Sequence, residues 1–147
     1  YIGFLNFKGS LFNPETCYLT NADKEMIGVV VSSVNCCSYC LTTHGDALRG
    51  YTKNPILVDK LSYNFRSARD MLTEKQYALC EYAWYVTKHA DEIGEEQIEK
   101  LRAVGFNDHE ILEAAFVAGF FNYTNRWVST IAPVANPGHF SHNRNFD

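Results

Sequence analysis

Helix start signals recur along this chain and divide most of it into helical segments. They lie at four positions: Thr20, Asn54, Thr73 and Asn107. Thr20 and Asn107 are each followed three residues later by a carboxylate, which is the spacing of a capping box. Asn54 precedes a proline, and proline is favoured at the first position of a helix. A chain with this many helix starts is constrained to fold as a set of packed helices.

The apolar pattern between these signals predicts helices over about 22–34, 37–49, 55–67, 73–89, 95–104 and 107–131. The lead-in over 1–19 is irregular, apart from a short helix near 2–7. Gly50 and Gly105 suit helix ends. The valines at 29–31 would favour a strand on propensity alone, but the capping signal before them favours a helix. No credible pair of strands is visible. We therefore predict an all-α fold, a bundle of about six helices.

Length and composition predict one globular domain over 1–147, with a core over about 21–134 and a loose C-terminal tail over 135–147. The chain has 147 residues, of which 46% are hydrophobic and 20% charged. Its net charge of −4 and the lack of a basic block argue against a nucleic-acid partner. The longest apolar runs, such as 114–121, are too short to span a membrane. No secretory signal pattern is visible.

Five cysteines are an odd count at a density below that of disulfide scaffolds. We therefore expect a reducing compartment, most simply the cytoplasm. Cys37 and Cys40 form a Cys-x-x-Cys pair, and His44 follows four residues later. In a helix these three side chains fall within a stripe of roughly 60°. Such a pair can close a disulfide if the backbone lets the sulfurs meet.

Three interpretations of the cysteine pair remain open from the residues alone. A zinc site would need four ligands, and only the pair and His44 are close in sequence. Buried cysteines can also simply pack. Redox chemistry is favoured, but the reactive sulfur is not decided. The helix dipole would stabilise a thiolate at Cys37, whereas His44 could take a proton from Cys40.

Glu25 could orient the imidazole of His44, as the acid of a catalytic triad does. It lies on an apolar helix that we expect to pack beside the cysteine helix. The other interpretation is a solvated residue on the helix face. The spacing of Glu25, Cys37, Cys40 and His44 resembles the signature of the alkylhydroperoxidase D family, within the carboxymuconolactone decarboxylase-like superfamily.

The flanking residues 31–35 and 121–126 look most like the uncharacterised peroxidase-related branch of that family. The resemblance covers about 21–134. It implies an all-helical fold that forms homo-oligomers, as trimers or as hexamers built from two trimers. It also implies a thiol peroxidase without haem, metal or another cofactor, which an external dithiol reductant protein must regenerate.

The resemblance implies a role for each residue of the signature. Cys40 would attack the peroxide, Cys37 would resolve the product as a disulfide, His44 would act as base and Glu25 as its relay partner. Tyr39 departs from the best-studied relay, which has a second histidine between the cysteines. Tyrosine is a poor base at pH 7, although it can hold a water or donate a hydrogen bond.

Further polar residues are candidates for the pocket. Asn122, Asn125 and Arg126 share one face of the last long helix, where they would shape the active-site pocket or form a polar stripe facing solvent or another subunit. Buried, such groups need hydrogen bonds. His139 and His142 have a spacing that could bind metal, but a loose tail explains them more simply, and we assign no metal ligand. Cys36 is interpreted as a packing residue.

The sequence therefore predicts an antioxidant enzyme that reduces small-molecule alkyl hydroperoxides through a Cys37–Cys40 dithiol/disulfide cycle. Two alternatives remain: a protein disulfide reductase or redox relay that uses the same pair, and a zinc-stabilised helical binding module. Lactone decarboxylation, the other activity of the superfamily, is disfavoured because that chemistry does not need the thiol pair.

Overall fold

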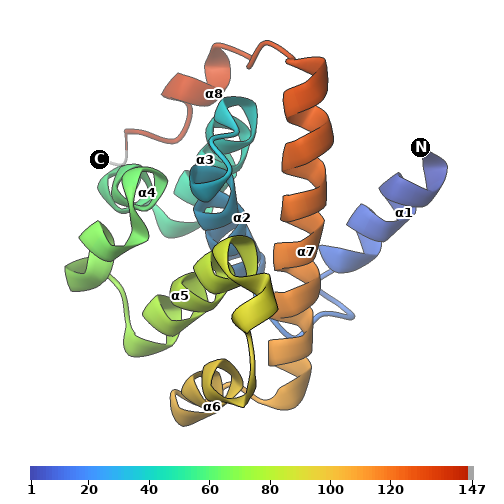
Figure 1. The fold of residues 1–147 in the computed structure, drawn as a ribbon. Helices are drawn as coiled ribbons and strands as arrows, with labels where there is room; N and C mark the ends of the chain where they lie inside the picture. Colours follow the sequence, from blue (N-terminus) through green and yellow to red (C-terminus); the bar gives the residue numbers. More distant parts are fainter. Residues whose placement is uncertain (146–147) are drawn as a thin grey trace.

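The protein is described here by a computed structural model, which covers residues 1–145. Phe146 and Asp147, the end of the expected tail, lie outside the described residues. Every regular element within 1–145 is helical: α1 (Ile2–Leu11), α2 (Asn21–Val34), α3 (Ser38–Thr52), α4 (Pro55–Tyr63), η1 (Phe65–Met71), α5 (Glu74–Lys88), η2 (Ala90–Glu92), α6 (Glu95–Ala103), α7 (Asp108–Ile131) and α8 (Gly138–Ser141). The all-α prediction is confirmed (Figure 1).

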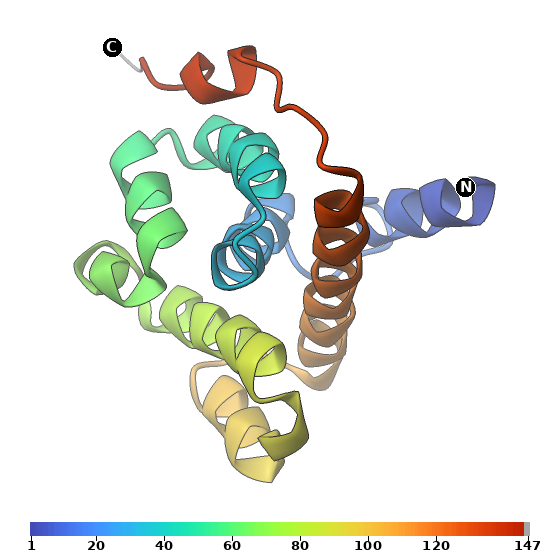
Figure 2. The ribbon, with the colours of Figure 1, turned by 45° about the horizontal axis from the view of Figure 1, so that its top comes forward.

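Helix α2 lies at the centre of the fold, and α3, α4, α5 and α7 surround it (Figure 2). Its apolar side chains are buried around its whole circumference, Val29, Val30 and Val31 among them. A helix buried on all sides does not need a polar face, so the valine run is compatible with a helix. The capping box of Thr20 and Asp23 is present at its start.

Helix α7 packs very closely on α2 at Gly28. A Cβ placed on Gly28 would lie 2.4 Å from Cζ of the Phe121 ring. Only the absence of a side chain there allows the ring to fill the space between the two helices. Phe121 also lies edge-on against the imidazole of His44, with the ring centroids 4.6 Å apart. The packing of α7 on α2 therefore positions one wall of the site described below.

The turn between α2 and α3 is a Schellman motif. The Cys36 N–H donates to Ser33 O at 3.2 Å and the Cys37 N–H donates to Ser32 O at 3.0 Å. Cys36 occupies the left-handed position of this motif, with φ of 54°, where glycine is usual. The same motif that ends α2 thus places Cys37 at the N-cap of α3.

Some helix ends differ from the sequence prediction. Helix α4 ends at Tyr63 rather than near residue 67, because Asn64 starts a 3₁₀ segment and its side chain accepts from the Arg66 N–H at 3.1 Å. Helix α3 continues past Gly50 to Thr52 and ends at Lys53, which is left-handed with φ of 54°. A single glycine weakens a helix by only about 1 kcal/mol, which tertiary packing can offset.

A buried ion pair fixes the N-terminal segment to α7. The Nζ of Lys24, which is fully buried, lies 3.0 Å from Glu113 Oε1 and donates to Leu11 O at 2.9 Å. The other Glu113 oxygen accepts from the N–H groups of Tyr18 and Leu19 at 2.7 and 2.8 Å. Burial raises the pKa of Glu113, but hydrogen bonds from Cys17, Leu19, Lys24 and Tyr18 outweigh it and hold that pKa below its ordinary value.

Residues 138–145, within the predicted loose tail, make side-chain contacts with α3 and α4, although residues 140–145 are exposed. Arg49 of α3 donates from Nη2 to His139 O at 2.6 Å and from Nε to His142 O at 3.1 Å. Arg144 pairs with Asp59 of α4. These partners are more than 80 residues away in the sequence, so local composition did not reveal them. Helix α8 contacts α3 and lies above it in the view of Figure 1.

Candidate active site at the start of helix α3

Cys37 and Cys40 are joined by a disulfide at the N-terminus of α3, with their Cα atoms 5.3 Å apart. Cys37 is the extended N-cap residue, and Cys40 lies in the first turn of the helix. The two residues are only 2% and 4% exposed. They pack against Val128 of α7 and against Tyr39. The oxidised pair is therefore shielded rather than displayed on the surface.

Glu25 of α2 and His44 of α3 form a carboxylate–imidazole pair, in which Glu25 Oε2 lies 2.7 Å from His44 Nδ1. Glu25 is 8% exposed, so its interpretation as a solvated helix-face residue does not hold. Because an ionised carboxylate only accepts hydrogen bonds, Nδ1 carries the proton and Nε2 of the neutral ring is left as an acceptor. His44 stands one helical turn after Cys40, on the same face of α3.

A hollow of about 350 Å³ opens beside the disulfide. It lies between the α2–α3 turn and the C-terminal end of α7, and its lining residues are Cys36, Cys37, Ser38, Tyr39, Val128, Ser129, Ala132 and Pro133. Cys37 lines it, whereas Cys40 is not among its lining residues. Tyr39, the residue between the two cysteines, is part of the wall. A small molecule in this hollow would meet the disulfide from the Cys37 side.

Asn122 and Asn125 do not line this hollow; they bind the α2–α3 turn to α7. The Nδ2 of Asn35 donates to Asn122 Oδ1 at 3.1 Å and to Asn125 Oδ1 at 3.0 Å. Asn125 Nδ2 donates in turn to Ser32 Oγ at 3.1 Å. Arg126, whose side chain lies on the exposed side of the cluster, donates from Nη1 to Asn122 Oδ1 at 3.0 Å. The side-chain amides of Asn122 and Asn125 therefore connect α7 to the turn that precedes Cys37.

Asn35 is the centre of this amide cluster, and the sequence analysis did not select it. The signal available there was the break in the helical pattern at Asn35, which marks a turn but says nothing of partners. Asn122 reaches a third helix, because its Nδ2 donates to Thr87 Oγ1 of α5 at 3.1 Å. The cluster therefore ties α5, α7 and the turn together.

The three remaining cysteines are free thiols in different surroundings. Cys36 is exposed and lines the hollow beside Cys37. Cys80 is fully buried, and burial raises the pKa of its thiol, which keeps it protonated and inert. Cys17 is half-buried, and its Sγ donates to the carbonyl groups of Ser10 and Leu11.

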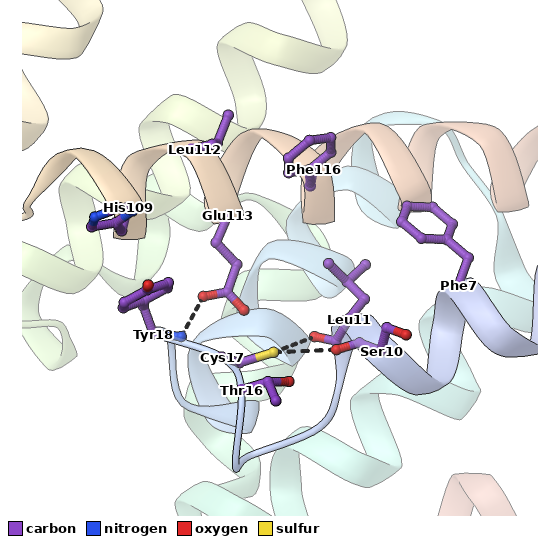
Figure 3. A pocket seen from close by; sticks show the side chains of 10 residues that line it. All are labelled: Phe7, Ser10, Leu11, Thr16, Cys17, Tyr18, His109, Leu112, Glu113 and Phe116. Carbon is purple, nitrogen blue, oxygen red and sulfur yellow. Dashed lines mark hydrogen bonds between the residues drawn. The ribbon is translucent and has the colours of Figure 1, made fainter.

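A second hollow, of about 280 Å³, lies between α1, the following loop and α7 (Figure 3). Its walls are mainly apolar, with Phe7 and Leu11 on one side and Leu112 and Phe116 on the other. The disulfide does not border it, and His44 lines neither hollow. We therefore place the candidate chemistry at the first hollow.

No helix within residues 1–145 combines the length and the apolar character needed to cross a membrane.

Comparison with solved structures gives extensive matches. An uncharacterized peroxidase-related protein from Silicibacter sp. TM1040 matches with a TM-score of 0.92 and 38% identity over 97% of this chain and 73% of its own. An uncharacterized peroxidase-related protein from Ralstonia eutropha JMP134, described as an alkylhydroperoxidase AhpD core, matches with a TM-score of 0.91 and 31% identity over 99% of this chain and 75% of its own.

A protein of unknown function from Agrobacterium tumefaciens, named as a candidate AhpD antioxidant defence protein, shares the fold. Its TM-score is 0.80 at 22% identity, over 92% of this chain and 89% of its own. No family model and no curated protein matches the chain.

Proposed function

This chain belongs to the alkylhydroperoxidase D-like superfamily, in its branch of uncharacterised peroxidase-related proteins, and we propose that it is a thiol-dependent peroxidase that reduces alkyl hydroperoxides. The observation that carries the proposal is the 2.7 Å contact between Glu25 and His44, one helical turn beyond a cysteine that pairs with Cys37. A base held by a buried carboxylate has no evident use beside cysteines that only pack. It does have a use beside a thiol that must ionise.

In the reduced protein, Nε2 of His44 takes the proton from the Cys40 thiol. The Cys40 thiolate attacks one oxygen of the hydroperoxide, so that an S–O bond forms and the O–O bond breaks. The alkoxide leaves as an alcohol with the proton that His44 held. Cys40 is then a sulfenic acid, two electrons more oxidised than the thiol.

Cys37 completes the half-reaction. Its sulfur attacks the sulfur of the sulfenic acid, the S–S bond forms, and the hydroxyl group leaves as water with the proton of the Cys37 thiol. Its place at the N-terminus of α3 stabilises a thiolate through the helix dipole. An external dithiol then reduces the disulfide and is itself oxidised, which suits a reducing compartment such as the cytoplasm. Both electrons come from thiols, so the cycle needs no metal or organic cofactor.

Tyr39 replaces the second histidine of the best-studied relay. In the wall of the hollow it can hold a water or donate a hydrogen bond to a leaving oxygen, but it is a poor base at pH 7. We therefore assign the proton transfer to His44 alone. The disulfide-reductase alternative uses the same pair, and it would require Cys37, which is 2% exposed, to become accessible to a partner protein.

We also propose that the chain forms homo-oligomers through α1 and α7. Large apolar side chains are exposed along the outer face of α7, at Leu112, Phe116, Tyr123, Trp127 and Ile131. Ile2, Leu5 and Phe7 are exposed on α1, which projects from the body of the fold (Figure 1). A continuous apolar face of this kind is typical of subunit contacts.

The test of the peroxidase proposal is a count of free thiols with intact mass, before and after one equivalent of cumene hydroperoxide is added to reduced protein. We expect the loss of two thiols and about 2 Da, mapped to Cys37–Cys40. Cys40→Ser should abolish the disulfide, and Cys80→Ser, which changes a buried cysteine outside the site, should not. Unchanged thiols in excess peroxide would refute the peroxidase function.

A further inference from the structure

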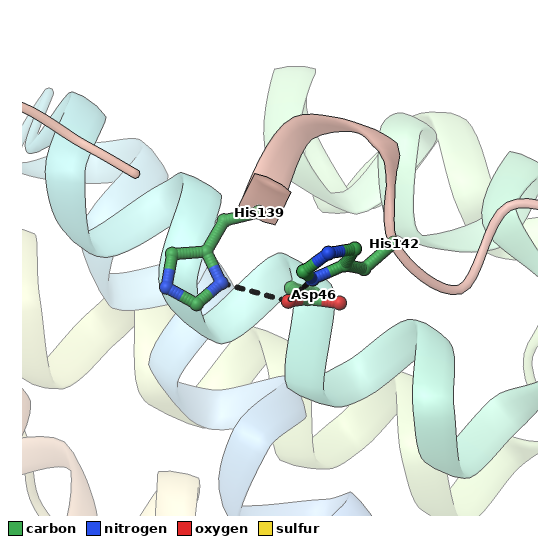
Figure 4. Close-up of side chains that lie close together, drawn as sticks. All are labelled: Asp46, His139 and His142. Atoms are coloured by element: carbon green, nitrogen blue, oxygen red, sulfur yellow. Dashed lines mark hydrogen bonds and ion pairs between the residues drawn. The ribbon is translucent and has the colours of Figure 1, made fainter. Parts of the chain in front are cut away.

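A second cluster of ionisable side chains lies on α3, at Asp46, and involves the C-terminal segment (Figure 4). The carboxylate oxygen Oδ2 of Asp46 lies 2.7 Å from Nδ1 of His139 and 3.4 Å from Nδ1 of His142. Asp46 is buried, His139 is half-buried and His142 is exposed. From the sequence alone, a loose tail explains these histidines more simply than a metal site does. Their contacts with Asp46 reopen that question.

The separations within this cluster suit a single small metal ion. One ligand atom from each residue can be chosen so that all three lie within 4.8 Å of one another. In a tetrahedral zinc site with bonds of about 2.0–2.1 Å, two ligand atoms are about 3.3 Å apart. The 3.4 Å distance from Oδ2 to His142 is close to that value. The 2.7 Å distance to His139 is about 0.6 Å shorter, so the His139 ring would move outward to admit an ion.

Neighbouring residues support the three ligands. The second oxygen of Asp46, Oδ1, accepts from Asn143 Nδ2 at 2.9 Å. Arg49 holds the backbone of the histidine segment through the carbonyl groups of His139 and His142. Its Nη2 lies 4.0 Å from Oδ1 of Asp46, so its charge is directed at the oxygen that the histidines do not face. Supporting contacts of this kind orient metal ligands.

The carboxylate oxygen Oδ2 of Asp46 already faces both imidazoles, at 2.7 and 3.4 Å. A metal cation could take the place of the protons that the two imidazoles now direct at Oδ2 of Asp46.

Gly138 provides an independent observation. A Cβ on Gly138 would lie 2.6 Å from Cε1 and 2.9 Å from Nε2 of His142. The imidazole of His142 therefore folds back over a residue that has no side chain, and this lets it face Asp46. Any larger residue at 138 would displace the ring.

We propose that Asp46, His139 and His142 form a binding site for one divalent transition-metal ion of the zinc type, with solvent at the remaining position. Two imidazoles and one carboxylate are a donor set that zinc accepts in proteins. The ion would fasten the C-terminal segment to the helix that carries the cysteine pair. The proposal does not depend on the peroxidase function, because none of its ligands takes part in the thiol chemistry.

The test is equilibrium dialysis of the full-length, metal-free, oxidised protein against zinc chloride, with the thermal midpoint recorded in parallel. A Cys36→Ser background removes the exposed thiol as a competing ligand. We expect one zinc per chain, and a rise of about 5 °C in the midpoint when zinc is in 100-fold excess over its dissociation constant.

Substitution of the proposed ligands tests whether zinc binds at Asp46, His139 and His142. His139→Ala and His142→Ala should each weaken zinc binding at least about 10-fold and reduce the thermal shift by half or more at the same zinc concentration, and Gly138→Ala should weaken binding similarly. His89→Ala, which changes a histidine at the end of α5, is the matched control and should leave binding unchanged. Each variant is first shown to be folded by its midpoint without metal. No zinc binding by the wild type, or zinc binding that survives both histidine substitutions, would overturn the proposal.

Discussion

Oε2 of Glu25 and Nδ1 of His44 lie 2.7 Å apart although the two residues belong to different helices. The contact fixes both the tautomer and the direction of the imidazole, and it places a base on the face of α3 that also carries Cys40. The chemistry proposed for the cysteine pair therefore depends on how α2 and α3 are set against each other.

Glu25→Gln should slow the loss of thiols with cumene hydroperoxide by about 10- to 100-fold, because His44 loses the carboxylate that orients it and stabilises its charged form. The measurement is stopped-flow reduction of peroxide in a single turnover. Glu96→Gln, on the exposed face of α6, is the control and should react at the wild-type rate. A wild-type rate for Glu25→Gln would mean that Glu25 takes no part in the proton transfer.

Gly28→Ala should destabilise the protein by about 1–3 kcal/mol, because the new methyl group would overlap the Phe121 ring. Urea denaturation measures this change in the free energy of unfolding. Gly119→Ala is the matched control: among residues 1–145 an added Cβ there meets nothing within 4 Å outside its own stretch of helix, so it should stabilise by about 0.5–1 kcal/mol. Phe121→Leu combined with Gly28→Ala should recover part of the loss.

Cys36→Gly should stabilise the protein by about 0.5–1 kcal/mol, because φ of 54° is strained for a residue with a side chain. Cys36→Ala keeps the strain and should show no such gain. Both variants should still form the Cys37–Cys40 disulfide with peroxide. Loss of that disulfide in both would show that the Cys36 thiol exchanges into the reaction.

Lys24→Met should destabilise the protein by about 3–5 kcal/mol at pH 7, because it leaves the Glu113 carboxylate buried without its cation. The lowered pKa of Glu113 means that its contribution to stability is complete above the ordinary range of a glutamate and is lost as the pH falls below about 4. The variant should therefore lose less stability than the wild type as the pH falls below about 4. If Lys24→Met and Lys24→Met/Glu113→Gln are equally unstable at pH 7, the unpaired carboxylate is not the cause.

Phe116→Asp should reduce the mass of the particle measured by light scattering, because it places a charge on the apolar face of α7, where Phe116 is 54% exposed. Tyr63→Asp changes an aromatic residue at the end of α4 that is 87% exposed, and it should leave the mass unchanged. A wild-type chain that is monomeric at micromolar concentration would contradict the proposed assembly.

Much of the fold could be predicted from local signals. The capping boxes at Thr20 and Asn107 mark the starts of α2 and α7, because a cap depends only on residues three positions apart. The pairing of Glu25 with His44 was suggested by a family spacing, since periodicity alone left Glu25 equally compatible with solvent.

Other features could not be predicted because they depend on distant partners. The packing of His139 depends on Asp46 and Arg49, which lie 93 and 90 residues earlier in the chain. The role of Asn35 depends on two amides of α7. In each case the sequence shows one polar group, and only the fold shows what it meets.

Lys24 and Glu25 are consecutive residues, and they make their ion pairs with different helices. Side chains of neighbouring helical residues point about 100° apart, so α2 is held against rotation from two directions at once. Leu11, Tyr18 and Leu19 contact the Lys24–Glu113 pair through their backbone groups. Residues 1–19 therefore help to hold α2 in the orientation in which Glu25 meets His44. Displacement of residues 1–19 would therefore remove contacts that hold α2, the helix whose Glu25 orients the imidazole.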